Sequence, residues 1–292
     1  MDRLIVPLLI AFFPFAALAG ETETPKPFNL AKINSAKDED EPHSTVDGRG
    51  IGQIYFTCDG ELYSARHDAK GWQAGQPYKD LPVRGDVRSV FVHFAKSGVS
   101  FPQTIFYATN SDAEKPNDRG NNFDIYSLRR NSASGPDFTV PAPLHSVCTP
   151  ADEMHPWLTS EGKLYFSRKT KEGWRVFVAR RGKPDQPFEK PVVVEIPVGF
   201  HHTTLTPDGK TMYLEGPLPG NRWGLFRSTQ SDGKWSEPEE LKSLNNAEGK
   251  TGDRSPNLSR SGSYLYFASD RPGGKGGLDI WYVSTTELGK PK

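Results

Sequence analysis

The residues best suited to chemistry in this chain are two histidines, His155 and His202, which occupy the same place in two copies of an internal repeat. Alignment of the copies puts Glu41, Phe91 and Ser255 at that place in the other three. Imidazole and carboxylate groups are common ligands of divalent metals. Glu41, His155 and His202 are therefore candidate metal ligands. The alternative is that these loop histidines beside proline make ordinary hydrogen bonds.

More charged side chains lie where a segment leads into the first strand of a copy or joins its second and third strands. In a closed ring of sheets, loops of these two kinds share one face around the central channel, where a binding site is expected. The residues predicted at this channel mouth, besides Glu41, His155 and His202, are Asp152, Glu153, Asp253, Arg254, Asp270 and Arg271. The acidic pairs admit another interpretation, in which carboxylates accept hydrogen bonds from backbone N–H groups and stabilise turns.

The sequence contains none of the familiar catalytic signatures. A Gly-x-Ser-x-Gly elbow, a phosphate-binding loop, a dinucleotide fingerprint and a His-Glu-x-x-His motif are all absent. Glycosidases need two carboxyl groups roughly 5 to 9.5 Å apart. The residues predicted for the innermost strands, such as 157–159 and 204–206, include no carboxylate. We therefore expect no catalytic residue and no cofactor, and we favour a noncatalytic protein over an enzyme.

These side chains must be positioned by the repeat itself. One tyrosine marks each copy, with steps of 52, 58, 48 and 53 residues between the markers Tyr55, Tyr107, Tyr165, Tyr213 and Tyr266. The apolar segments are short and rich in aromatic and β-branched residues, and turns containing glycine separate them, which predicts antiparallel strands. A repeat unit buries its apolar face only against its neighbours. A ring of such units leaves no long sheet edge exposed.

The sequence thus predicts an all-β protein, a single β-propeller of about five four-stranded blades over residues 20–292. Six blades is the alternative, with the extra blade in the long second copy. Residues 27–34 match residues 238–245, the fourth segment of another copy, whereas the last copy stops after Ser284 without one. We expect the N-terminal segment to complete the last blade and close the ring. The alternative is an exposed tail.

The first 19 residues have the pattern of a signal peptide, with Arg3 before an apolar stretch that ends at Ala17-Leu18-Ala19. Because the stretch is short for a membrane span, we expect cleavage after Ala19, no remaining anchor and a periplasmic or secreted protein. An uncleaved anchor is the alternative. A disulfide between Cys58 and Cys148 is a candidate in such a compartment. With 36 basic and 36 acidic residues, the chain offers no charge excess toward nucleic acid.

Residues 269–282, SDRPGGKGGLDIWY, resemble the WD-like propeller repeat of TolB-type periplasmic proteins, a repeat that also precedes OmpA-type domains in envelope proteins. The shared order is proline, Leu-Ser/Thr, Asp-Gly, Tyr-Phe, Ser-Asp-Arg and Asp-Ile-Tyr/Trp, and the last three copies carry most of it. This resemblance implies a binding or scaffolding propeller of the cell envelope, often one that contacts proteins. The chain departs from TolB in its five copies, where TolB-like propellers have six blades, and in showing no appended domain.

We therefore expect an exported, noncatalytic binding or scaffolding protein whose channel mouth contacts an envelope protein or a glycan. The alternative is a hydrolase or lyase on the same scaffold. It would act on a polysaccharide with a metal or carboxylate site at the channel mouth.

Overall fold

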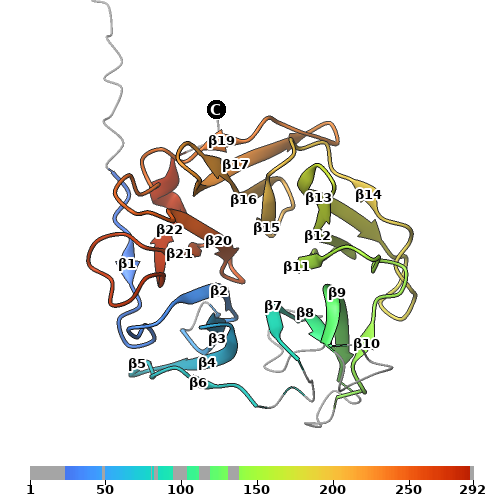
Figure 1. Ribbon diagram of the computed structural model, residues 1–292, viewed down its shortest axis with the longest axis horizontal. Coiled ribbons are helices and arrows are strands. Elements are labelled where there is room, and N and C mark those ends of the chain that lie inside the picture. The colour runs from blue at the N-terminus through green and yellow to red at the C-terminus, as the bar shows by residue number, and fades with distance from the viewer. Residues whose placement is uncertain are drawn as a thin grey trace, which may run out of the picture.

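The computed structural model describes residues 24–47, 50–79, 81, 85–94, 104–111, 119–130 and 138–289. They form a ring of five antiparallel sheets (Figure 1), and side chains from the innermost strands of all five sheets line the space at its centre, which we call the central channel. The all-β propeller with five four-stranded blades is confirmed, and the six-blade alternative is wrong. The predicted signal peptide, residues 1–19, lies outside the described ranges. Within those ranges, no helix has the length and apolar character that a membrane crossing requires.

The blades follow one another along the chain, and the strands run outward from the channel. The first blade contains β2 (Glu39–Ser44), β3 (Gly52–Cys58), β4 (Glu61–Asp68), β5 (Gly71–Trp72) and β6 (Gln76–Pro77). The second contains β7 (Val87–His93), β8 (Thr104–Ser111), β9 (Arg119–Arg129) and β10 (Ala142–Pro143). The third contains β11 (Glu153–Leu158), β12 (Lys163–Thr170), β13 (Gly173–Arg180) and β14 (Val192–Val193). The fourth contains β15 (His201–Leu205), β16 (Thr211–Leu218), β17 (Arg222–Ser231), β18 (Lys234–Trp235) and β19 (Glu239–Glu240). The fifth contains β20 (Asp253–Leu258), β21 (Tyr264–Ser269), β22 (Asp279–Ser284) and β1 (Phe28–Asn29), and a short 3-10 helix, η1 (Thr285–Leu288), follows β22.

Apolar side chains fill the spaces between neighbouring blades rather than the blades themselves. Each of the five hydrophobic clusters combines residues of two adjacent blades. Phe106 of the second blade and Phe166 of the third, for example, lie in one cluster and are almost wholly buried. Burying such a side chain stabilises the fold by about 1.5–3 kcal/mol. One blade alone would leave both of its faces in water.

The N-terminal segment closes the ring, as predicted. Strand β1 pairs with β22 of the last blade, with Phe28 opposite Tyr282 and Asn29 opposite Trp281. Five residues on, buried Asn34 accepts a hydrogen bond from Ile280 N and donates one to Ile280 O, both at 2.9 Å.

The matching segment of the fourth blade uses the same device. There, Asn245 accepts from Leu225 N at 2.8 Å and donates to Leu225 O at 3.2 Å. The sequence match between residues 27–34 and 238–245 therefore reports a shared structural role.

Replacing Asn34 with alanine is expected to lower the free energy of unfolding by about 2 kcal/mol, because two buried hydrogen bonds of about 1 kcal/mol each are lost. Equilibrium unfolding in urea measures the loss. Asn245→Ala should cost a similar amount, and alanine at exposed Lys32 of the same segment should cost less than about 0.5 kcal/mol. An Asn34→Ala protein as stable as the Lys32 variant would contradict this account of ring closure.

Every innermost strand contains a bulge at the same position, where the pairing register shifts. One residue in each bulge adopts a positive φ of 49° to 55°, and these residues are Glu41, Ser89, His155, His202 and Ser255. A bulge turns a side chain away from its regular direction. Here five bulges turn five side chains toward one channel.

Phe91 was expected to be the second blade's counterpart of Glu41, His155, His202 and Ser255. This expectation is wrong, because the sequence alignment of the second copy with the others was out of register. Phe91 pairs with Phe106 as His43 pairs with Tyr55, so Phe106 is the marker of the second blade and Tyr107 is not. Ser89, two residues before Phe91, holds the ring position.

The candidate disulfide between Cys58 and Cys148 is not formed, because both cysteines are free. The Cys58 thiol lies in β3 and donates to the Glu39 carboxylate at 3.4 Å. The Cys148 thiol, just after the second blade, contacts Ile125 O at 3.5 Å. Burial and the nearby Glu39 raise the pKa of Cys58 to about 11, so this thiol stays protonated near neutral pH.

Candidate functional site

Two tiers of side chains surround the channel at the face where the innermost strands begin, which we call the channel mouth. The inner tier consists of the positive-φ residues Glu41, Ser89, His155, His202 and Ser255. The outer tier consists of the residues one position earlier, Asp40, Arg88, Met154, His201 and Arg254. Each blade thus contributes one residue to each tier.

In the inner tier, Glu41 is held by the next two blades. Its carboxylate accepts hydrogen bonds from Ser89 N and Ser89 Oγ, both at 3.1 Å, and lies 3.7 Å from His155 Nε2. Burial acts to raise the pKa of Glu41, but His155, Arg88 and the Ser89 N–H outweigh it and lower the pKa. Glu41 is therefore an ionised carboxylate inside the channel.

The two candidate histidines stack on each other. The ring centroids of His155 and His202 are 3.9 Å apart with an interplanar angle of 18°. Burial, reinforced by His155 and His201, lowers the pKa of His202 well below its ordinary value, so this ring is neutral. Stacked rings direct their nitrogen lone pairs along parallel planes, which do not converge on one ion. The cavity beside them has a volume of about 20 Å³, room for about one water. The geometry therefore does not favour metal coordination by Glu41, His155 and His202.

Two carboxylates from different blades, Asp40 of the outer tier and Glu215 of β16, share two partners. Asp40 accepts from Ser255 Oγ at 2.6 Å and lies 3.6 Å from the Arg254 guanidinium. Glu215, from β16 of the fourth blade, accepts from Arg254 Nε at 3.2 Å and from Ser255 N at 2.9 Å. The Asp40 side chain is 16% exposed and that of Arg254 31%, whereas Glu215 is wholly buried.

The surroundings push the pKa values of these two carboxyl groups in opposite directions. Burial raises the pKa of Asp40, and the nearby Glu41 adds to the increase, against the opposing effect of Arg254. For Glu215, burial also acts to raise the pKa, but Arg254 and His201 outweigh it and lower the pKa. The cluster therefore combines a carboxyl group that tends to keep its proton with two that give theirs up.

Aromatic side chains flank the same face. Trp174, near the start of β13, stacks on His201 with centroids 5.2 Å apart and an interplanar angle of 7°. Trp223, near the start of β17, packs its ring at 5.0 Å against His201. Both tryptophans are partly exposed. They offer an apolar surface beside the charged outer tier.

The predicted channel-mouth residues separate into two groups. Glu41, His155, His202 and Arg254 converge on the channel. The others stabilise loops or blade contacts: Asp152 accepts from Phe123 N, Glu153 from Thr149 N and Arg168, Asp253 from Asn246 N and Arg271, and Asp270 from Thr251 N and Gly252 N. Of the acidic pairs, Asp152 and Glu153 accept backbone N–H groups in this way, which agrees with the turn-stabilising interpretation.

Asp40 and Glu215 are site residues that were not predicted from the sequence. Strand β2 begins at Glu39 and contains Asp40 and Glu41, so the prediction of innermost strands without carboxylates is wrong. Glu215 pairs with His201, and the residues at this ladder position in the other blades are Thr57, Ala108, Ser167 and Ala268. The sequence pattern that could have indicated Glu215 is a carboxylate at a repeat position where the other copies have small residues.

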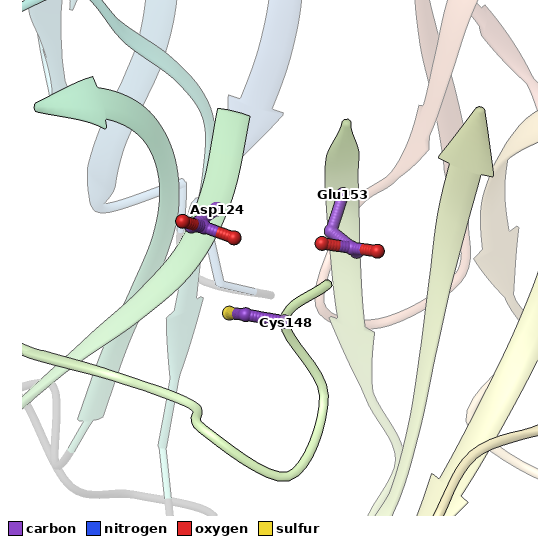
Figure 2. Close-up of side chains that lie close together, drawn as sticks. All are labelled: Asp124, Cys148 and Glu153. Carbon is purple, nitrogen blue, oxygen red and sulfur yellow. The ribbon is translucent and has the colours of Figure 1, made fainter. Parts of the chain in front are cut away.

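A further group of possible metal ligands lies between the second and third blades, where Asp124, Cys148 and Glu153 approach within 4.8 Å (Figure 2). Glu153 already pairs with Arg168 at 2.6 Å. Burial, together with Asp124, raises the pKa of Cys148 far above its ordinary value, so the thiol is not available as a thiolate. These three side chains therefore form a contact between the second and third blades, in which Arg168 pairs with Glu153.

No protein-family model matches the chain, and no curated protein matches it either. Among solved structures, the catalytic domain of a GH62 α-L-arabinofuranosidase from Coprinopsis cinerea is similar at a TM-score of 0.56 and 12% identity, covering 88% of this chain and 95% of that one. An α-L-arabinofuranosidase from Lactobacillus brevis reaches 0.56 at 13% identity, covering 88% and 92%. A putative TolB from Agrobacterium tumefaciens reaches 0.49 at 14% identity, covering 90% of each chain. At these identities the likeness concerns the β-propeller fold.

These comparisons correct the expected function. The expectation of a noncatalytic binding or scaffolding protein followed from the TolB resemblance, but the higher-scoring structures are propeller glycoside hydrolases. The alternative, a hydrolase on this scaffold, has the better support.

Proposed function

We propose that this protein is a hydrolase that cleaves glycosidic bonds of a polysaccharide at the channel mouth. The observation that carries the proposal is the carboxylate cluster of Asp40, Glu41 and Glu215, in which the pKa of Asp40 is raised and the pKa values of the other two are lowered. Glycoside hydrolysis commonly uses one protonated and one ionised carboxyl group. Groups with pKa values pushed apart fit those two roles.

Asp40 is the proton donor in this proposal. Its side chain is partly exposed, so it can reach the oxygen of a scissile bond at the mouth. The hydrogen bond from Ser255 Oγ fixes its orientation. Protonation of the leaving oxygen by a positioned carboxyl group typically accelerates such reactions 10²- to 10⁴-fold.

Glu41 is the base that accepts a proton from the attacking water. It is ionised, and its side chain keeps 8% exposure, whereas Glu215 has none. Because Glu215 cannot touch a substrate, it acts as a positioning residue that holds Arg254 beside Asp40.

The surroundings suit a sugar. Trp174 and Trp223 offer aromatic faces against which the apolar face of a sugar ring can pack, and Arg254 offers N–H donors to its hydroxyl groups. Pentose polymers are the first substrates to test, since the similar structures include arabinofuranosidases and a β-xylosidase/α-arabinofuranosidase solved with xylotriose. The predicted signal peptide supports action in the periplasm or outside the cell.

The purified chain is expected to release reducing sugars from at least one pentose polymer among arabinoxylan, xylan and arabinan. Reducing-end assays and chromatography of the products between pH 4 and 8 measure the release. Glu237→Gln, which alters an exposed carboxylate far from the mouth, should leave the rate unchanged. A folded protein that releases nothing from any of these polymers or from aryl pentosides would contradict the proposal for this substrate class.

A further inference from the structure

A larger cavity lies on the face opposite the channel mouth, between the first and last blades. It is formed by loops that join first to second strands and third to fourth strands, and its volume is about 450 Å³. We call it the seam cleft, lined by Val46, Asp47, Gly50, His67, Trp72, Ser259, Ser261, Ser263, Tyr264, Tyr266 and Tyr282. This volume falls within the usual range for small-ligand sites.

Aromatic rings form two walls of the seam cleft. On the first blade, Trp72 packs edge-on against His67 with centroids 4.8 Å apart. On the last blade, Tyr264 packs edge-on against Tyr282 at 5.7 Å. Tyr264 is 44% exposed, although it belongs to a strand. Such rings present flat apolar surfaces together with polar groups at their edges.

A row of serine hydroxyls also lines the seam cleft, in the turn between β20 and β21 that precedes Tyr264. Ser259 Oγ and Ser261 Oγ are 3.2 Å apart, and Ser261 donates to Ser263 Oγ at 3.1 Å. Each hydroxyl both donates and accepts, and those of Ser261 and Ser263 belong to exposed residues. The row therefore offers hydrogen bonds of either direction to a ligand.

The charges of the lining narrow the ligand class. Asp47 supplies a carboxylate, and His67 is fixed by a hydrogen bond between its Nδ1 and Gly50 O. The described lining contains no lysine or arginine. Within the described lining no lysine or arginine could pair with an anionic ligand, and a purely apolar ligand would take the exposed hydroxyls of Ser261 and Ser263 out of water at a cost in free energy. A neutral ring with an apolar face and a hydroxyl-rich edge satisfies both kinds of surface.

We propose that the seam cleft binds a neutral saccharide unit and anchors the protein to a polysaccharide without taking part in bond cleavage. The choice of polymer rests on the proposed function. The site itself rests on the aromatic walls and the serine row, which lie on the opposite face from Asp40. A bound saccharide would also bridge the first and last blades, where β1 closes the ring.

The test measures binding separately from turnover. Wild-type protein is mixed with insoluble arabinoxylan for sedimentation and with xylotriose for calorimetry. Trp72→Ala removes one wall, and Ser263→Arg fills the cleft from an exposed position without removing a packed ring. The matched control is Trp235→Ala, since Trp235 occupies the outer strand β18 of the fourth blade as Trp72 occupies β5 of the first.

Both cleft variants are expected to bind arabinoxylan at least tenfold more weakly than the wild type, while Trp235→Ala binds as the wild type does. Turnover of a small aryl glycoside should be unchanged in Ser263→Arg. The seam-cleft proposal is overturned if the wild type binds no saccharide, or if both cleft variants bind it as tightly as the wild type does. If the protein hydrolyses the polysaccharide but its binding does not depend on Trp72, the proposed function is supported and the seam-cleft proposal is refuted. If binding depends on Trp72 but no hydrolysis occurs, the seam-cleft proposal is supported and the proposed function is refuted.

Discussion

Asparagine in place of Asp40 is expected to reduce hydrolysis of the polysaccharide about 1,000-fold, as measured by initial rates of sugar release. The side chain keeps its size and can still accept the hydrogen bond from Ser255, but its amide group has no acidic proton to transfer to the leaving oxygen. Proton transfer by a positioned acid supplies 10² to 10⁴ of the rate. An aryl glycoside with a nitrophenol leaving group needs little protonation, so the same variant should lose much less activity on that substrate.

The control for this prediction is Asp185→Asn, an exposed carboxylate far from the channel, which should retain the wild-type rate. Glu215→Gln tests the positioning role in another way. The charge of Glu215 raises the pKa of Asp40 while Arg254 lowers it, so loss of the Glu215 charge is expected to lower the pKa of Asp40. Because the acid must be protonated to act, the alkaline limb of the pH–rate profile should move to lower pH. An Asp40→Asn enzyme that keeps more than a tenth of the polysaccharide rate would refute the assignment.

Acid is expected to destabilise this protein steeply below pH 6.5. Burial lowers the pKa of His43 to about 3 and that of His201 to about 4, and it lowers the pKa of His202 well below 6.5. Between those values and 6.5, the unfolded chain binds protons that the folded chain does not, so stability rises with pH. Each imidazole contributes about 1.4 kcal/mol per pH unit. His43 and His201 together should lower the free energy of unfolding by about 3 kcal/mol per unit between pH 6 and pH 5, and His202 and His93, whose pKa burial lowers to about 4, add to this loss.

Carboxyl groups modify this slope at lower pH. Glu41 and Glu215, whose pKa values are lowered, add to the loss below their ordinary values, whereas Asp40 and Glu153, whose pKa values are raised, act against it. Urea unfolding at pH 7, 6 and 5 gives the slope. His43→Gln should reduce the slope of stability against pH by the contribution of one bound proton. His145→Gln, at an exposed position, should leave the slope unchanged. A stability that stays level from pH 7 to pH 5 would show that these imidazoles are not buried as described.

The repeat predicted the ring and its closure because each copy carries its own turn and aromatic residues. The match between Asn34 and Asn245 was visible as a sequence likeness, and both side chains bond a neighbouring backbone in the same way. The placement of Glu41, His155 and His202 in one ring also followed from alignment. Ser89 did not, because the second copy has its aromatic pair in the reverse order and the alignment slipped by two residues.

The chemistry of the site was less accessible from the sequence, because its groups come from different blades. Asp40 and Ser255 are 215 residues apart along the chain and 2.6 Å apart in space. The pKa of Asp40 depends on burial and on Arg254 of the last blade, which no local pattern reports. Glu215 was visible only as a departure from the small residues of the other copies.

Because β1 is the first strand to be synthesised and belongs to the last blade, the order of synthesis affects when the ring can close. The first segment of the propeller to leave the ribosome is the one that completes the last blade, so it has no partner until β22 has been made. A chain interrupted before the fifth blade is not a smaller propeller. It has an unpaired segment at its beginning and an uncovered apolar blade face at its end, both accessible to proteases and chaperones. Once β22 has been made, β1 can pair with it and the apolar blade face is covered at the same time. A complete chain therefore differs from an incomplete one in exposing neither the unpaired segment nor the apolar face.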